Sequence, residues 1–184
     1  MPELSRLDDI RKKRPLLHCI SNTVTANDCA NLALALGASP MMAEAPEEAA
    51  EIARLADAEV LNLGTPTAAK YAACLAAGCE AARLGKPIVL DPVGVGASCW
   101  RLEGAGRLLA AFRPCILRAN LSEARSLLGL AGREKGVDSA AEAAGAERAA
   151  LAAELARACG CAVLLTGAED LVSDGARAAA VSGG

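Results

Sequence analysis

Aromatic residues are nearly absent from this sequence. One Trp, one Tyr and one Phe make up 2% of its 184 residues, whereas hydrophobic residues make up 53%. The core must therefore be aliphatic, with Ala and Leu expected on helices and Val and Ile on strands. The Lys and Arg residues are scattered, the net charge is −3, and no stacking aromatics accompany the basic residues. This composition argues against nucleic-acid binding.

Long apolar runs are also missing. Gly, Pro or charged residues interrupt every apolar stretch well before it reaches the length of a membrane span. The N-terminal stretch MPELSRLDDIRKKRP is charged where a secretory signal peptide would be apolar. A chain of 184 residues is long enough to form one domain with a sizeable core. The sequence therefore predicts a single cytoplasmic domain over residues 1–184.

Histidine is scarce, and the cysteines lack a metal-binding pattern. His18 is the only histidine, and the eight cysteines include no CxxC pair. A zinc site and a hydrolytic triad are therefore poorly supported. A secreted disulfide framework does not fit a chain for which no signal peptide is expected. We expect small buried thiols in a reducing compartment, and a structural role for His18 inside a strand.

The familiar phosphate-binding motifs are incomplete. Residues 94–98, GVGAS, lack the third glycine of a dinucleotide fingerprint. Residues 84–87, LGKP, have the Gly-Lys of a P-loop, but Pro stands where Ser or Thr would bind the metal. A nucleotide site must therefore be built in another way.

Strand-like and helix-like segments alternate along the chain, and this favours an α/β fold with a mostly parallel sheet. Strands are expected at residues 16–20, 39–43, 59–64, 87–93, 115–119 and 161–167, with a hairpin over 170–181 that turns at Asp174-Gly175. Helices are expected from Asn22 or Thr23 to 36, and at 46–57, 67–84, 103–112, 122–129 and 147–159, with a loop or weak helix at 131–145.

Polar residues and glycines follow the predicted strands. They are Asn22, Asn62, Gly64, Thr65, Asp91, Arg118, Asn120, Glu123, Thr166 and Gly167. Each alone has an ordinary explanation as a cap or turn residue. Ligands of parallel α/β sheets bind at the carboxyl ends of the strands. Acids, an Arg and small residues gathered on that edge suit a phosphorylated ligand with Mg²⁺.

The stretch VLDPVGVGA, residues 89–97, ends an apolar strand in an acid. Asp91 can hold Mg²⁺ through water beside a phosphate. Gly94 and Gly96 are expected to leave room for a ligand at the main chain. Glu123, near Arg118, offers a second carboxylate beside a guanidinium that can bind phosphate. The residues alone thus predict an α/β protein with a nucleotide or phosphate ligand.

Several blocks, in order, resemble the hydroxyethylthiazole kinase family. They are HCISNTVTANDCANLALALGASPMMAEAPEE, VLNLGT, GKPIVLDPVGVGA, ILRANLSE, KGVDS and LLTGAEDLVSDG, and they run from about Arg14 to the end. The resemblance implies a ribokinase-like α/β/α fold and transfer of the γ-phosphate of ATP, with Mg²⁺, to the hydroxyl of 4-methyl-5-(2-hydroxyethyl)thiazole. It also implies a trimer with active sites between subunits, in thiamine biosynthesis or salvage.

The resemblance assigns roles by position. Met42, with its soft thioether, would contact the thiazole, and Asn22, Gly64 and Thr65 would line its pocket. ATP would be bound by Arg118 and Thr166, and Asp91 and Glu123 would lie at the metal. Ala119 stands where the family usually has Gly. If that backbone has positive φ, Ala would strain it by roughly 1–2 kcal/mol.

The family's Gly-Thr-Gly loop, followed by Cys or Asp, does not occur in these residues. The catalytic residues are therefore unknown, and we expect a fold that is incomplete at its C-terminus and low kinase activity from this chain alone. Two other functions stay open. One is a non-catalytic or degenerate nucleotide-binding fragment of the same fold, and the other is a related kinase for another small alcohol.

Overall fold

The computed structural model describes residues 4–130 and 145–182, and the chain divides into two compact units, Met1–Val89 and Leu90–Gly184. The expectation of one domain over residues 1–184 stays a prediction. Within the described residues, no helix is long and apolar enough to cross a membrane.

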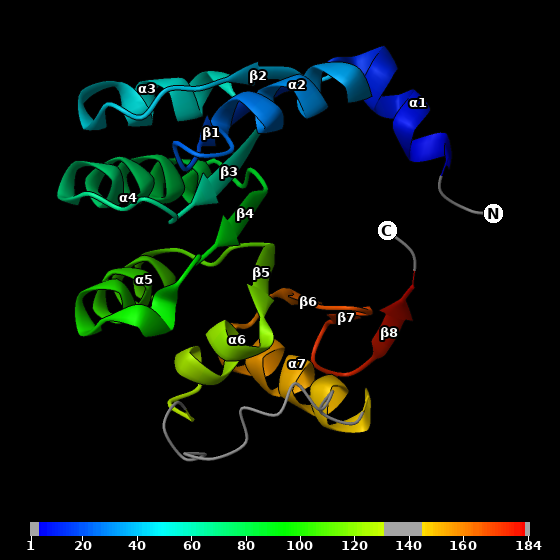
Figure 1. The fold of residues 1–184 in the computed structure, drawn as a ribbon. Coiled ribbons are helices and arrows are strands. Elements are labelled where there is room, and N and C mark those ends of the chain that lie inside the picture. Colours follow the sequence, from blue (N-terminus) through cyan, green and yellow to red (C-terminus); the bar gives the residue numbers. More distant parts are fainter. Residues whose placement is uncertain (1–3, 131–144, 183–184) are drawn as a thin grey trace. The chain divides into compact units, whose positions relative to one another are not determined.

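The first unit alternates helices with parallel strands (Figure 1). Its elements are α1 (Leu4–Lys13), β1 (Leu16–Ile20), α2 (Ala26–Leu36), β2 (Ser39–Met41), α3 (Pro46–Leu55), β3 (Ala58–Asn62) and α4 (Ala68–Arg83). The strand order is β2-β1-β3, and both pairings are parallel. The segments that follow the three strands therefore lie at one edge of the sheet.

Local sequence explains where these helices begin and end. Gly37 closes α2 in the left-handed conformation that a residue without a side chain adopts readily. Pro46 opens α3, where its missing N–H costs nothing, and two glutamates in the first turn suit the positive end of that helix. Helices α3 and α4 lie side by side in Figure 1, and their Ala-rich faces allow a close approach.

The second unit contains a parallel strand pair followed by a hairpin. Its elements are α5 (Cys99–Ala111), β5 (Ile116–Asn120), α6 (Leu121–Leu127), α7 (Gly145–Cys159), β6 (Ala162–Thr166), β7 (Asp170–Ser173) and β8 (Ala178–Val181). Strand β4 (Ile88–Asp91) crosses the boundary between the units, and a short 3-10 turn, Val95–Ala97, follows it. Strands β5 and β6 are parallel, whereas β6-β7-β8 is antiparallel.

The α/β class with mostly parallel strands is confirmed, and so is the hairpin. Asp174 organises the hairpin turn, because its Oδ1 accepts the N–H groups of Ala176 and Arg177 at 3.0 and 2.8 Å. The core is aliphatic as expected, with Ile20, Leu61 and Leu165 completely buried. Of the three aromatic residues, Tyr71 and Phe112 are buried, and Trp100 at the start of α5 is partly exposed.

Several helix starts differ from the predictions: α5 begins at Cys99 and not at 103, and α7 begins at Gly145 and not at 147. Helix α2 begins after Thr25 and not at Asn22 or Thr23. The Asn22 Oδ1 atom still accepts the N–H groups of Val24 and Thr25, each at 3.0 Å, as a cap residue does, and here it caps the turn that precedes the helix. Helix α6 is capped by Asn120, upstream of the Ser122 start that the sequence suggested. The predicted loop or weak helix at 131–145 lies outside the described residues apart from Gly145, which begins α7.

The expectation of buried thiols was wrong for most cysteines. All eight lie within the described residues and none is in a disulfide, but only Cys19 and Cys74 are buried. Ala119 raises no backbone strain, because it lies inside strand β5 and is not among the described non-glycine residues with positive φ, which are Arg14 and Thr65.

Candidate functional site

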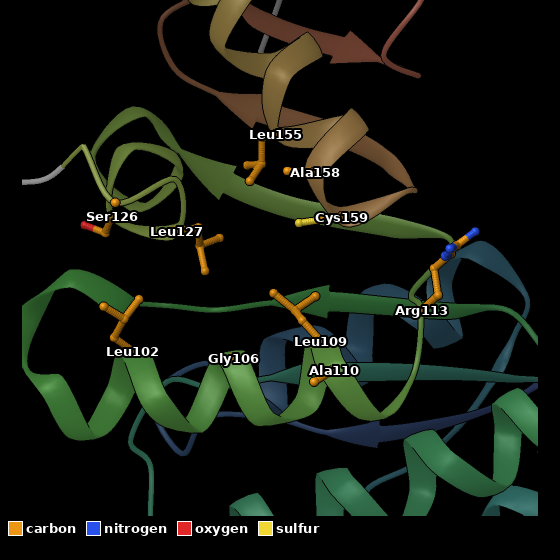
Figure 2. A pocket seen from close by; sticks show the side chains of 11 residues that line it. Leu102, Gly106, Leu109, Ala110, Arg113, Ser126, Leu127, Leu155, Ala158 and Cys159 are labelled. Atoms are coloured by element: carbon orange, nitrogen blue, oxygen red, sulfur yellow. The ribbon is translucent and has the colours of Figure 1, made fainter.

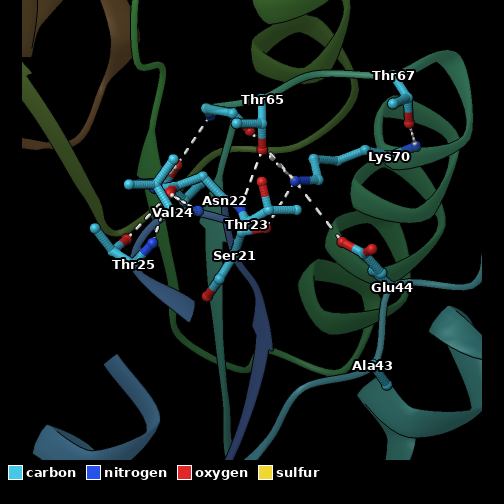
Figure 3. Close-up of polar contacts among 12 residues, drawn as sticks. Ser21, Asn22, Thr23, Val24, Thr25, Ala43, Glu44, Thr65, Thr67 and Lys70 are labelled. Carbon is cyan, nitrogen blue, oxygen red and sulfur yellow. Dashed lines mark hydrogen bonds and ion pairs between the residues drawn. The ribbon is translucent and has the colours of Figure 1, made fainter. Parts of the chain in front are cut away.

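Three of the predicted pocket residues form one polar network in the first unit (Figure 3). Asn22, after β1, donates from Nδ2 to the Asn62 Oδ1 atom at 3.1 Å, and that oxygen also accepts the Gly64 N–H at 2.9 Å. The Thr65 hydroxyl accepts the N–H of Thr23 at 3.1 Å. The segments after β1 and β3 are thus joined by side chains.

Gly64 is required by this close approach. A Cβ atom at this position would lie 2.8 Å from the Asn22 Cβ and 2.9 Å from the Asn62 Oδ1. Any side chain would therefore push the two segments apart. Thr65, the next residue, has φ +45, a left-handed conformation that β-branched residues rarely adopt.

Met42 lies in a pocket beside this network. The pocket has a volume of about 190 Å³. Its lining comprises Cys19, Ser21, Thr23, Ala26, Met42 and Glu44. Ser21 and Thr23 flank Asn22 in the chain, so the network fixes one wall of the pocket. Met42 is partly exposed, which gives its thioether access to a small molecule.

In the second unit, Asp91 and Arg118 come together. The Arg118 Nη1 atom donates to Asp91 Oδ2 at 2.9 Å, between the ends of strands β4 and β5. Burial raises the pKa of the Asp91 carboxyl above its ordinary value, the positive charge of Arg118 opposes that shift, and the negative charge of Glu123 adds to it. The Arg118 side chain is 48% exposed and is therefore accessible to a phosphate.

Glu123 is committed to the backbone. Its Oε1 atom accepts the N–H of Gly94 at 2.8 Å, and its Oε2 atom accepts the N–H of Asn120 at 2.9 Å. The Asn120 side chain accepts the Glu123 N–H in return, which completes a capping box at the start of α6. Glu123 thus ties the turn after β4 to the end of β5.

The two glycines after Asp91 do not leave the space that we expected for a ligand. Gly94 has φ +67 and donates to Glu123, so the left-handed turn itself requires glycine. A Cβ atom on Gly96 would collide with the Ser126 hydroxyl. Both glycines are therefore explained by the turn and by its packing on α6.

Thr166 ends strand β6 opposite Asn120 in the parallel register. Its hydroxyl donates to the Ala119 carbonyl at 3.4 Å. Thr166, Arg118 and Asn120 are thus neighbours near the carboxyl ends of β5 and β6. No group of three or more His, Cys, Asp or Glu side chains suited to a metal ion occurs in the part of the chain that the structure describes.

A larger cavity than the one around Met42 lies elsewhere in the second unit and contains none of the predicted site residues. Its volume is about 590 Å³. Figure 2 shows Leu102 and Leu109 of α5 facing Leu127 of α6 and Leu155 of α7 across it. This apolar lining carries no cluster of acids or hydroxyls that would bind a phosphate.

Sequence reasoning missed one charged residue of the first unit, Lys70. It is buried in the first turn of α4 and donates to the segments after β1 and β3. The only signal was a single Lys among alanines, a pattern that usually marks a solvated helix face.

Comparisons with known proteins agree on one family. A model of the hydroxyethylthiazole kinase family matches residues 7–184. Hydroxyethylthiazole kinase of Methanosphaerula palustris is 45% identical, over 98% of this chain and 67% of its own length. That of Methanoculleus marisnigri is 47% identical, over 95% of this chain and 62% of its own length.

Solved structures agree. The hydroxyethylthiazole kinase protein from Pyrococcus horikoshii OT3 has a TM-score of 0.85 and 42% identity, covering 98% of this chain and 66% of that one. Adenosine kinase from Schistosoma mansoni in complex with 2-fluoroadenosine has a TM-score of 0.52 at 13% identity over 97% of this chain and 64% of that one. This second likeness shows the fold alone. Together with the first, it confirms the expected α/β fold class.

This chain spans about two thirds of the length of these relatives. The family model nonetheless covers nearly all of it. With that match and with relatives above 40% identity, the chain belongs to the hydroxyethylthiazole kinase family.

Proposed function

We propose that the protein transfers the γ-phosphate of ATP to the hydroxyl of 4-methyl-5-(2-hydroxyethyl)thiazole, a step of thiamine biosynthesis or salvage. The observation that carries this proposal is family membership, with relatives that are named hydroxyethylthiazole kinase. The comparisons do not favour the alternatives of a non-catalytic fragment or a kinase for another alcohol.

The pocket around Met42 is the proposed thiazole subsite. A thioether and the small side chains of Cys19 and Ala26 suit a flat sulfur heterocycle. Asn22, Gly64 and Thr65 support the wall of this pocket through their hydrogen bonds. We therefore assign these three residues to shaping the pocket, and Met42 to contact with the ring.

Asp91, Arg118 and Thr166 form the proposed subsite for ATP and Mg²⁺. Mg²⁺ keeps several water ligands and needs only one or two carboxylates beside the phosphates, so Asp91, an acid at the end of β4 whose side chain is 14% exposed, fits this ion. The metal would neutralise phosphate charge. Arg118 would bind phosphate oxygens, and Thr166 would contact the nucleotide. Glu123 would act on the metal indirectly, by holding the turn after Asp91.

A coupled assay of ADP release tests the proposed reaction. A protein that includes the family's Gly-Thr-Gly loop, given Mg-ATP and the thiazole alcohol, should show turnover that depends on the alcohol, and simple alcohols such as ethanol should give none. The 184 residues alone, which lack that loop, should give far less. The loop-containing protein is the wild type in the kinetic tests below. A loop-containing protein that binds Mg-ATP and phosphorylates no member of a panel of thiazole alcohols would contradict the proposal.

Replacing Arg118 by Ala should weaken Mg-ATP binding. Loss of a charge-assisted phosphate contact should cost about 1.5–3 kcal/mol, which is a tenfold to hundredfold rise in Kd. Isothermal titration calorimetry measures the Kd for Mg-ATP in each protein. Arg177→Ala is a matched control, because Arg177 pairs with Asp174 on the hairpin in the same way, at 2.8 Å. An unchanged Kd in Arg118→Ala would remove Arg118 from the nucleotide subsite.

We also propose that the protein forms a trimer in the cytoplasm. Helix α2 buries only Ala33, and Val24, Leu32 and Leu34 are 79%, 62% and 58% exposed. So much apolar surface on and beside one short helix is typical of an interface. Light scattering should give the mass of three chains, and Leu32→Lys should lower that mass. A monomer at micromolar concentration would contradict the trimer.

A further inference from the structure

Lys70 is a buried charge to which the proposed reaction assigns no role. Its side chain is only 4% exposed. Its Nζ atom donates to the Ser21 carbonyl at 2.7 Å, to the Gly64 carbonyl at 3.2 Å and to the Thr65 hydroxyl at 3.3 Å. These three acceptors match the three protons of an ammonium group.

The acceptors of Lys70 come from different segments. Ser21 follows β1, and Gly64 and Thr65 follow β3. Glu44, which follows β2, places its Oε2 atom 3.7 Å from the same Nζ (Figure 3). One ammonium group therefore joins the segments after all three parallel strands of the first unit.

Two of these contacts lead directly to the proposed thiazole pocket. Ser21 and Glu44 line it. The Thr65 hydroxyl that Lys70 contacts also accepts the N–H of Thr23, which is another lining residue. Lys70 itself is absent from the lining, so any effect on a bound molecule must pass through its neighbours.

The backbone at Thr65 gives a second, independent sign of constraint. A threonine at φ +45 costs free energy and persists only where surrounding contacts hold it. Such contacts are the hydrogen bonds that the Thr65 hydroxyl accepts from the Lys70 ammonium group and from the Thr23 N–H. Strain held in this way is typical of a segment whose position matters for binding.

Lys86 shows what a purely structural lysine looks like in the same unit. Its Nζ atom also donates to three oxygens, the carbonyls of Ala53, Arg54 and Ala56, at 2.9, 2.6 and 2.5 Å. These carbonyls belong to the end of α3, where a cation is ordinary helix capping. None of its acceptors lines the pocket around Met42.

We infer that Lys70 is a positioning residue that sets the shape of the pocket around Met42 by joining the segments after β1, β2 and β3. This inference rests on the proposed function in that the pocket is taken to be the thiazole subsite. It assigns part of the selectivity for the thiazole alcohol to a residue that does not touch it.

Lys70→Met tests the inference, with Lys86→Met as the matched control. Methionine keeps the length and apolar stem of the side chain and removes all donors. Without these hydrogen bonds the pocket walls should shift, and kcat/KM for the thiazole alcohol should fall about 10- to 100-fold, mainly because its KM rises. The KM for ATP should stay unchanged. Lys86→Met should lower Tm and leave both KM values unchanged. Lys70→Arg, which keeps a cation and several donors, should restore part of the lost kcat/KM.

Amide hydrogen exchange supplies a readout that does not depend on turnover. In Lys70→Met, residues 21–25 and 62–67 should exchange faster, whereas Lys86→Met should change exchange only near the end of α3. If Lys70→Met does not fold, Lys70→Gln, which keeps a shorter donor, goes through the same measurements.

The outcomes separate the two proposals. A wild-type protein that phosphorylates no thiazole alcohol contradicts the proposed function, and the exchange data then decide the role of Lys70. If the wild-type protein is active, two results would overturn the inference. One is an unchanged KM for the thiazole alcohol in Lys70→Met, and the other is an unchanged rate of amide exchange at residues 21–25 in that variant.

Discussion

Replacing Glu59 by Leu is expected to lower the free energy of unfolding by about 3–5 kcal/mol at pH 6. Glu59 on β3 and His18 on β1 are opposite each other in the parallel register, and both side chains are completely buried. The His18 Nδ1 atom lies 2.8 Å from Glu59 Oε2. Removing the carboxylate would leave a buried imidazolium without its counter-charge.

The environment of His18 favours the charged ring. Its Nε2 atom lies 2.7 Å from the Ala43 carbonyl, which can only accept, so both ring nitrogens face acceptors. Burial alone lowers the pKa of His18, but Glu59, the Ala43 carbonyl and the more distant charge of Glu48 together raise it above the ordinary 6.5. The structural role expected for His18 therefore includes an ion pair.

The sign of the pH dependence follows from this pKa. Because folding raises the pKa of His18, the pair contributes its full stabilisation below pH 6.5 and loses it as the pH rises through the folded-state value. The difference between wild type and Glu59→Leu should therefore shrink toward alkaline pH. Urea denaturation of wild type and of Glu59→Leu at several pH values measures the free energy of unfolding of each protein.

Two further variants make this prediction specific. His18→Leu with Glu59→Leu should recover most of the loss, because an apolar pair can replace a buried ion pair at little net cost. Glu147→Leu, which removes an exposed partner of Arg125, should cost about 1 kcal/mol or less. A Glu59→Leu protein as stable as wild type at pH 6 would show that the pair contributes nothing.

Asp91→Asn is expected to lower thiazole-dependent kcat about 100-fold or more while Tm changes little. Both oxygens of Glu123 accept backbone N–H groups, so the metal-holding role proposed for this edge falls chiefly on Asp91. The amide of Asn keeps an oxygen for Arg118 but loses the charge that attracts Mg²⁺. Phosphoryl transfer depends strongly on such charge placement.

Titration of Mg²⁺ at fixed ATP distinguishes a metal role from a structural one. The Asp91→Asn variant should need more Mg²⁺ for half-maximal rate than wild type. Asp174→Asn is the matched control, since Asp174 also pairs with an Arg but lies in the β7–β8 turn. It should keep the wild-type kcat and Mg²⁺ dependence. Intact magnesium-dependent activity with a large fall in Tm would assign Asp91 to the fold.

Local patterns in the sequence predicted much of the fold. Gly37, Pro46 and the Asp174-Gly175 turn each mark a boundary through their own backbone preferences, and the structure has a helix end, a helix start and a hairpin at these points. The sequence placed Asp91 and Arg118 at one edge of the sheet, because parallel strand ends meet there, but it did not predict the ion pair between them. These features depend on interactions between residues close in sequence or on the regular geometry of parallel strands.

Other features depend on register and packing that no local pattern specifies. The contact between His18 and Glu59 needs the alignment of β1 with β3, and the inward direction of Lys70 needs the rotation of α4 on the strands. The capping box from Asn120 to Glu123 was readable in the sequence as Asn-x-x-Glu. It was missed because Ser122 offered a competing helix start.

The single tryptophan has an optical consequence. Trp100 belongs to the second unit, whereas the buried Tyr71 belongs to the first. Fluorescence excited at the red edge of the absorption band therefore reports on the second unit alone, while far-ultraviolet circular dichroism reports on the helices of both. Two denaturation midpoints from these signals would mean that the units melt separately, and a common midpoint would mean that they melt together.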